Sequence, residues 1–280
     1  MSDHDETTGS ADTEAQARKA DSEYEDHFDF DEEIDGHKQP LIDHLIELRQ
    51  RILRSIGVIG LLFLPLYFFA NDIYVFVAKP LMANLPEGAG MIATEVASPF
   101  LTPFKLAIFS AIFLGMPYLL HQIWGFVSPG LYKKEKHFAL PLLVSSVCLF
   151  YLGMVFAYYV VFPIIFQFFA SVTPLGVTMM TDISRYLDFV IKLFFAFGFA
   201  FEIPVATLLL VWSGISTADS LAAKRPFIIV GCFGVGMLLT PPDIISQVLL
   251  ALPMWVLFEV GVLTARLVER RAKLPTSPQP

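Results

Sequence analysis

Two acidic side chains lie inside apolar runs of this sequence. Glu202 lies in FGFAFEIPVATLLL, and Glu259 lies in WVLFEVGV. An ionised carboxylate at the centre of a bilayer costs about 2.5 kcal/mol or more, so each should face a partner or cavity, or stay protonated. For Glu202 we favour a polar contact with a partner or a moving substrate over a bond to Thr or Gln within the bundle. For Glu259, snorkelling or a bond within the bundle is the favoured interpretation.

A third acid precedes the first apolar run, in the stretch HLIELRQRILRS. Glu47 and Arg51 are four residues apart, and such a pair contributes about 0.3–0.5 kcal/mol on an exposed helix. Leu41, Leu45, Leu48 and Ile52 share one face, which predicts an amphipathic extension of the following span. On spacing alone, Glu47 is interpreted as one half of a surface ion pair.

A fourth acid, Glu135, stands among three lysines in the stretch GFVSPGLYKKEKH. This stretch is either a solvated basic loop or a binding surface, since Phe126 and Tyr132 offer apolar contacts beside the acid. An acid–aromatic surface suits a basic, partly apolar peptide, because a carboxylate accepts two parallel hydrogen bonds from a guanidinium.

The sequence contains none of the common catalytic motifs. HExxH, GxSxG and a P-loop are missing, and the cysteines Cys148 and Cys232 lie singly in apolar segments without metal-ligand spacing. We therefore expect no enzyme activity, no metal, no cofactor and no disulfide.

The composition assigns the chain to the membrane proteins. Hydrophobic residues make up 55% and charged residues 16%, against about 25% charged in an average soluble chain. Spans in lipid must pair their backbone groups internally, so an all-α integral membrane protein is predicted. Six transmembrane helices are expected, at about 52–69, 104–124, 138–169, 186–212, 226–240 and 244–267.

Two of these spans have unusual lengths. The third, at about 32 residues, should be tilted or project from the membrane. The fifth covers about 22 Å, less than a bilayer core of about 30 Å. Pro241, Pro242 and Asp243 follow it, and consecutive prolines predict a tight turn before the sixth.

Charge predicts the topology. Residues 1–36 hold 14 Asp and Glu against Arg18 and Lys19, which predicts a disordered acidic tail. Residues 37–267 form the expected membrane domain, and residues 268–280 form a second tail. Basic residues gather at the two ends and in the 2–3 and 4–5 loops, so both termini are expected to be cytoplasmic.

Six motifs, in this order, together resemble the TatC family, the peptide-recognising core of the twin-arginine protein translocase. They are HLIELRQR, MIATEVASPF, FVSPGLYKKEK, FAFGFAFEIPVA, KRPFIIVG and GMLLTPPDIISQ. The resemblance covers about residues 40–266. It implies a glove-shaped, concave six-helix bundle whose fifth and sixth helices are short.

The resemblance also assigns roles near the cytoplasmic face. Glu47 and Glu135 are expected to face the two consecutive arginines of a signal peptide. Arg51 is hypothesised to occupy Glu47 in the free protein, where a peptide arginine would otherwise bind. The other expected signal-peptide residues are Arg49, Phe126, Leu131 and Tyr132.

Within the membrane, the resemblance implies contacts with the single-span proteins TatB and TatA and self-association of TatC. The residues expected there are Glu202, Gln247, Met237, Leu238, Leu239 and Thr240, with Pro241, Pro242 and Asp243 as a functional outer turn. The implied activity is export of folded proteins across the bacterial inner membrane by the proton motive force. Two alternatives are a proton-coupled small-molecule transporter, with Glu202, Asp243 and Glu259 as a relay, and a purely structural assembly subunit.

Overall fold

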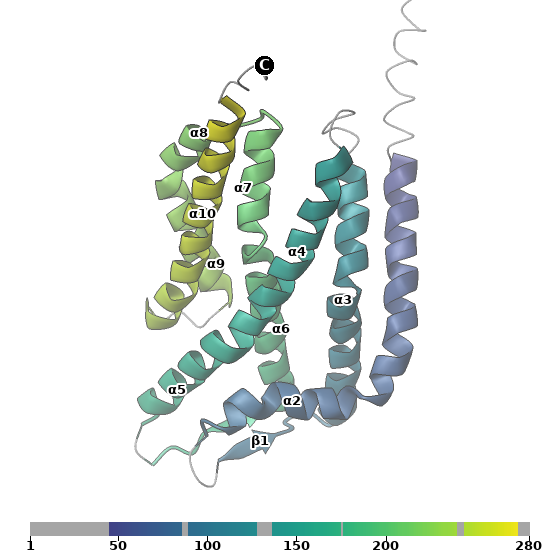
Figure 1. Cartoon of the computed structure of the whole chain (residues 1–280). Helices are drawn as coiled ribbons and strands as arrows, with labels where there is room; N and C mark the ends of the chain where they lie inside the picture. Colours follow the sequence, from purple (N-terminus) through teal and green to yellow (C-terminus); the bar gives the residue numbers. More distant parts are fainter. Residues whose placement is uncertain (1–44, 86–88, 128–135, 175, 240–243, 274–280) are drawn as a thin grey trace, which may run out of the picture. The chain divides into compact units, whose positions relative to one another are not determined.

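The computed structural model describes residues 45–85, 89–127, 136–174, 176–239 and 244–273, and the helices dominate it (Figure 1). The chain divides after Arg54 into two units. The predicted acidic tail and the predicted Pro241–Asp243 turn lie outside the described residues.

Among the residues that the structure describes, five helices are long and apolar enough to cross a membrane, and a sixth apolar helix is shorter. The long ones are Leu45–Phe68, Ser98–Phe126, Leu140–Val172, Ile183–Trp212 and Ile244–Arg270, and the shorter one is Arg225–Leu239. The prediction of an all-α membrane protein with a short fifth helix is confirmed. The expectation of a short sixth helix is wrong, because the apolar helix Ile244–Arg270 has 27 residues and is long enough to cross a membrane. A cytoplasmic position of both termini and a glove shape stay predictions.

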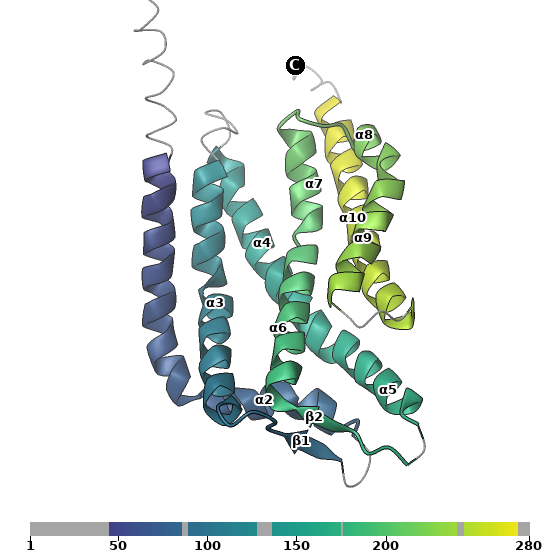
Figure 2. The same cartoon turned by 180° about the vertical axis from the view of Figure 1, so that it is seen from behind.

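The segments that link these helices carry structure that the sequence did not predict. Helix α2 (Ala70–Met82) follows the first span, and strand β1 (Gly90–Ile92) pairs in parallel with β2 (Met180–Asp182), with Gly90 opposite Met180. These elements lie together at one end of the helices, and α8 (Ala218–Ala223) lies at the other (Figures 1 and 2). The loops between spans one and two and between spans three and four therefore share one side.

The third span is a single long helix with a register shift in its middle. It consists of α4 (Lys136–Phe156), a π-helical turn (Ala157–Val161) and α5 (Phe162–Val172). It runs obliquely past α3 (Ser98–Val127) and α6 (Ile183–Ala200) in both views (Figures 1 and 2). The apolar part of 33 residues is about 50 Å long, so the tilt fits it to a bilayer core of about 30 Å.

The fourth span is broken at Glu202. Helix α6 ends at Ala200, and α7 (Ile203–Trp212) begins after a turn at Phe201 and Glu202. Pro204 lacks the N–H that would bond the preceding turn, and the amide of Glu202 bonds Phe199 O at 3.0 Å, a tighter turn than in an α-helix. Pro204 therefore accounts for the break at this position.

A second proline, Pro80 inside α2, leaves the carbonyl of Phe76 without a helical donor. The hydroxyl of Tyr158, from the π-helical turn, donates to this carbonyl at 2.8 Å, and the two rings of Phe76 and Tyr158 stack with centroids 4.9 Å apart. The tyrosine therefore satisfies the backbone group that the proline left unpaired, and it joins α2 to the third span.

The same arrangement occurs in α3. Pro117 lacks the N–H that would reach Phe113 O, and the hydroxyl of Tyr151 donates to that carbonyl at 2.9 Å. Both tyrosines come from the third span. In lipid, where water cannot replace a lost backbone bond, a side-chain donor is the available substitute.

Replacing Tyr158 by Phe should destabilise the folded chain by roughly 0.5–2 kcal/mol, because Phe76 O loses its donor while the packing of the ring is kept. Thermal unfolding in detergent would measure this as a fall in Tm of about 2–4 °C per kcal/mol. The matched control is Tyr159→Phe, since this neighbouring side chain is exposed and its hydroxyl makes no bond to the described residues. Equal midpoints for the two variants would contradict the role of the Tyr158 hydroxyl.

The core lies where α4 crosses α6, and two glycines allow the close approach. A Cβ on Gly153 would lie 2.4 Å from the carbonyl oxygen of Phe197, and one on Gly198 would lie 2.5 Å from the ring of Phe150. Phe150 and Phe197 are fully buried. Aromatic rings fill the space around them, and the small residues at the crossing set the distance between the helices.

Candidate functional site

Glu47 lies on the first helix, within the unit that ends at Arg54. Arg51 donates to its carboxylate through Nε at 2.9 Å and through Nη2 at 2.6 Å, and both bonds go to Oε1. Oε2 accepts no bond from the residues that the structure describes. The side chain of Glu47 is 40% exposed, so the acid predicted to receive a peptide arginine already holds a guanidinium with one oxygen and keeps the other open.

The other expected peptide-binding residues are described in part. Arg49 is exposed on the same helix as Glu47, and Phe126 is half-buried in the last turn of α3. Leu131, Tyr132 and Glu135 lie outside the described residues. The helical extension predicted before the first span is present from Leu45 onward.

Glu202 sits at the break between α6 and α7, where it precedes the first residue of α7. Its Oε1 is buried and has no hydrogen-bond partner among the described residues. The Ser146 hydroxyl of α4 lies close to the carboxyl group, but it is likewise buried without a bond within 3.5 Å. The Thr207 hydroxyl donates to Pro204 O and not to Glu202. The alternative interpretation, a hydrogen bond between a threonine of the bundle and Glu202, is therefore not supported for Thr207.

The predicted partner-binding edge belongs to α9 (Arg225–Leu239) and α10 (Ile244–Lys273). Met237 and Leu238 are 58% and 78% exposed, whereas Leu239 packs against the core. Gln247 is half-buried, and its backbone approaches Gly236. Thr240, Pro241, Pro242 and Asp243 lie outside the described residues. An apolar groove of about 140 Å³, lined by Cys232, Phe233 and Leu252 among others, runs between the two helices.

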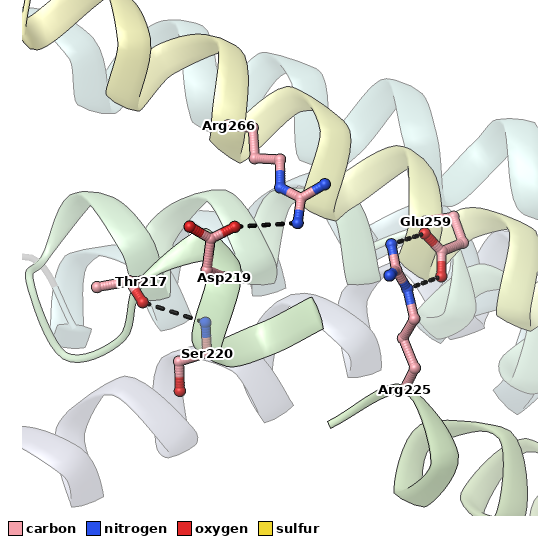
Figure 3. Close-up of polar contacts among 6 residues, drawn as sticks. All are labelled: Thr217, Asp219, Ser220, Arg225, Glu259 and Arg266. Atoms are coloured by element: carbon pink, nitrogen blue, oxygen red, sulfur yellow. Dashed lines mark hydrogen bonds and ion pairs between the residues drawn. The ribbon is translucent and has the colours of Figure 1, made fainter. Parts of the chain in front are cut away.

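Glu259, the second acid of the membrane segments, is paired within the bundle. Arg225, the first residue of α9, donates through Nε to Oε1 at 2.6 Å and through Nη2 to Oε2 at 2.8 Å (Figure 3). The interpretation of Glu259 as a bundle contact is confirmed. A carboxylate held by both oxygens in this way is poorly placed to relay protons.

A second ion pair joins α8 to α10 close to the first. Arg266 Nη2 donates to Asp219 at 3.0 Å, and the Thr217 hydroxyl accepts from the amide of Ser220 and so caps α8 (Figure 3). The two ion pairs tie both ends of the short α8–α9 connection to the same face of α10.

A third ion pair links α3 to α6. Lys105 Nζ lies 2.5 Å from Asp188 Oδ1, and both side chains are partly exposed. Lys192, one turn further along α6, is exposed and has no ion-pair partner in the part of the chain that the structure describes. Asp188 had not been singled out from the sequence.

Asp182 joins the segment that follows β1 to the first turn of α6. Its Oδ2 accepts from the amide and hydroxyl of Thr94 at 2.9 and 2.6 Å, and its Oδ1 accepts from the amides of Ser184 and Arg185 at 2.9 and 3.0 Å. The Thr94 hydroxyl, with the amides of Arg185, Thr94 and Ser184, lowers the pKa of Asp182 well below its usual range. Asp182 both caps α6 and holds the chain after β1.

The lowered pKa of Asp182 makes a pH-dependent contribution to stability. Because the carboxylate is favoured in the folded state, its contribution is present above the unfolded pKa of about 3.9 and is lost as the pH falls toward the folded pKa. Asp182→Asn should therefore lower Tm near neutral pH and flatten the loss of Tm between about pH 5 and pH 3. Asp72→Asn, at an exposed acid of α2, is the control and should keep the wild-type slope. Identical slopes for all three proteins would refute the assignment.

The family described as Sec-independent protein translocase protein (TatC) matches residues 43–253, which is most of the chain. This chain belongs to the TatC family. TatC proteins are components of a protein translocase and not enzymes, so the chain is a multi-pass membrane protein of protein transport.

Individual TatC proteins are similar over nearly their whole length. The TatC of Azotobacter chroococcum is 61% identical over 241 residues, which cover 86% of this chain and 94% of that protein. The TatC of Escherichia coli is 56% identical over 228 residues, covering 81% and 88%. A crystal structure of the twin arginine translocase receptor TatC superimposes with a TM-score of 0.74 at 34% identity, covering 81% of this chain and 100% of that one.

The TatC resemblance drawn from the six motifs is confirmed, but several polar contacts of this TatC fold were missed. Lys105–Asp188 and Arg225–Glu259 join residues 83 and 34 positions apart, and the Thr94–Asp182 contact spans 88. The available signal was the charge itself, because each of these ions lies in or beside an apolar run and needs a partner there.

Proposed function

We propose that this TatC-family chain is the receptor core of a twin-arginine translocase. It binds twin-arginine signal peptides at the cytoplasmic face and, with TatB and TatA, exports folded proteins across the bacterial inner membrane, driven by the proton motive force. It works without a cofactor and associates with further copies of TatC. Membership of the TatC family and the structural likeness to a twin arginine translocase receptor support this function.

The observation that carries the proposal is the arginine already bound to Glu47. Arg51 bonds Oε1 of Glu47 and leaves Oε2 without a bond from the described residues, so this carboxylate binds a guanidinium and has a second oxygen for another. The Glu47 side chain is 40% exposed, so a peptide arginine can reach the carboxylate beside Arg51. Arginine is favoured over lysine because its planar fork matches the carboxylate.

Glu135 is proposed to take the second arginine of the peptide. The apolar residues that follow the arginines would contact Phe126, Leu131 and Tyr132, and Arg49 of the first helix is the remaining proposed peptide contact. Two acids on separate elements, each taking one guanidinium, require both arginines of the motif.

The partner contacts are proposed for the membrane segments. Glu202, with an unpaired buried oxygen, offers a hydrogen bond to a transmembrane helix of TatA or TatB, and such bonds contribute about 1 kcal/mol in lipid. Met237, Leu238, Leu239, Thr240 and Gln247, with the Pro241–Asp243 turn, form the proposed edge for TatB. The exposure of Met237 and Leu238 supports this assignment.

Photocrosslinking tests the proposal directly. A photoreactive amino acid at Phe126 should crosslink to a twin-arginine signal peptide, and less than a tenth as much to the same peptide with two lysines. The control position is Val96, which is fully exposed just before the start of α3, whereas Phe126 lies in the last turn of that helix. Equal crosslinking from both positions, or to both peptides, would reject peptide recognition and leave a structural subunit as the better description.

A further inference from the structure

A groove of about 330 Å³ runs along α10 beside the two ion pairs of Figure 3. Its charged lining is Arg225, Glu259 and Arg266, and its apolar lining includes Val256, Val260 and Leu263. It is distinct from the apolar α9–α10 groove at Cys232, although Trp255 borders both. No proposed contact of a signal peptide or partner uses its charged residues.

Both guanidinium groups keep donors for a further ligand. Arg225 uses two of its five N–H groups on Glu259, and Arg266 uses one on Asp219. The side chains of Arg225 and Arg266 are 42% and 38% exposed. Their remaining donors are therefore open to a group that enters the groove.

The position of the groove along α10 matches the boundary of a bilayer. Helix α10 has 30 residues and is about 45 Å long, whereas a bilayer core of about 30 Å takes about 20 residues. Counted from Ile244, the core ends near residue 264, so Arg266 lies at the level of the headgroups. Val256, Val260 and Leu263 lie below it, beside the acyl chains, and are 44–59% exposed.

The charge of the lining favours an anion. Two guanidinium groups face one carboxylate there, and Arg270 follows Arg266 by one turn on the same face of α10. Basic residues at a membrane boundary attract anionic lipids at about 1 kcal/mol each. Asp219 does not line the groove, and its side chain is 87% exposed. Its carboxylate therefore faces water and not an anion in the groove.

We propose that this groove binds one anionic phospholipid. The phosphate accepts hydrogen bonds from Arg266 and from the N–H groups of Arg225 that Glu259 leaves free. One acyl chain lies along Val256, Val260 and Leu263. The bound lipid thereby joins α8, α9 and α10 at their common end, in addition to the two ion pairs. The proposed lipid site depends only on the residues that line the groove and on the depth of the groove in the bilayer. It does not depend on which leaflet this end of the bundle faces.

Native mass spectrometry of the purified full chain, released from detergent micelles, tests the proposal. Wild type with added phosphatidylglycerol should retain one lipid per chain and should bind phosphatidylcholine more weakly. Arg266→Gln should bind phosphatidylglycerol about fivefold more weakly, the equivalent of about 1 kcal/mol. Its fold should persist, because the exposed Asp219 loses little with its partner.

Lys224→Gln is the matched control, since it removes one positive charge at the same end but from an exposed residue outside the groove. It should bind phosphatidylglycerol like wild type. Equal losses in Arg266→Gln and Lys224→Gln, or equal retention of both lipids by wild type, would overturn the proposal.

A second measurement separates the lipid from its headgroup. Phosphatidylglycerol should raise the Tm of wild type in detergent and of Lys224→Gln equally, and that of Arg266→Gln less, whereas inorganic phosphate at the same concentration should leave all three unchanged. A full shift with phosphate alone would mean a free-anion site. Displacement of the lipid by a second copy of the chain would mean an interface between copies. Either result would overturn the assignment to a lipid.

Discussion

Charge reversal at Glu47 and Glu135 together is expected to abolish binding of a twin-arginine signal peptide. Each hydrogen-bonded guanidinium–carboxylate contact contributes about 1.5–3 kcal/mol, and reversal adds repulsion between like charges, so affinity should fall by more than about 100-fold. Each single Glu→Gln change should cost about 10-fold or more. Fluorescence anisotropy of a labelled peptide with the detergent-purified protein measures the loss.

Two further variants make this result specific. Glu95→Arg reverses an exposed acid near the strand pair and should leave peptide affinity unchanged. Arg51→Ala removes the guanidinium that occupies Glu47 Oε1, so peptide affinity should stay the same or increase. Unchanged binding in the Glu47/Glu135 double variant would refute the site. A large loss in Arg51→Ala would refute the interpretation that Arg51 stands in for a peptide arginine.

Replacing Gly153 by alanine is expected to cause a large loss of stability, although it adds only one methyl group. The new Cβ would lie 2.4 Å from Phe197 O and 2.9 Å from its carbonyl carbon, and these are backbone atoms that cannot rotate away. Helices α4 and α6 must then separate at the centre of the core. Overpacking of this kind costs about 1–3 kcal/mol or more. Thermal unfolding in detergent should show Tm lower by at least several degrees.

Gly231→Ala is the control for this substitution. It makes the same change in a helix, at a position of α9 where the new Cβ meets nothing within 4 Å beyond the adjoining residues and the backbone of its own helix. Alanine is a better helix former than glycine, so this variant should be neutral or slightly stabilised. Equal unfolding midpoints for the two variants would show that α4 and α6 separate easily, contrary to the tight crossing described here.

The spans were predictable because the solvent of this chain is lipid. A backbone in hydrocarbon must be helical, so each apolar run predicted a helix. Helix α2 was not predicted, since it is short, contains Pro80 and lies between spans, where the apolar signal does not require a helix. Its proline is tolerated because Tyr158 supplies the lost bond from a distant part of the chain.

For the candidate site too, the sequence identified the residues but not all of their partners. The motifs around Glu47, Glu135 and Glu202 were recognisable as those of the TatC family, and family membership is confirmed. The motifs carried no information on which of these acids already has a partner. The ion pair at Glu47 was predictable from an i,i+4 spacing, whereas the partner of Glu259 lies 34 residues away on another helix.

The sequence alone therefore determined the class of protein, the number of apolar helices and the acids that require explanation in lipid. Tertiary structure decided which charges neutralise one another: Arg225 and Arg266 meet acids of other helices and line a common groove, whereas Oε1 of Glu202 has no partner among the described residues. The physical reason is that the cost of a charge in a membrane depends on its local residue type and depth. Whether a partner of opposite charge offsets this cost depends on the distances between helices, which only the tertiary packing sets.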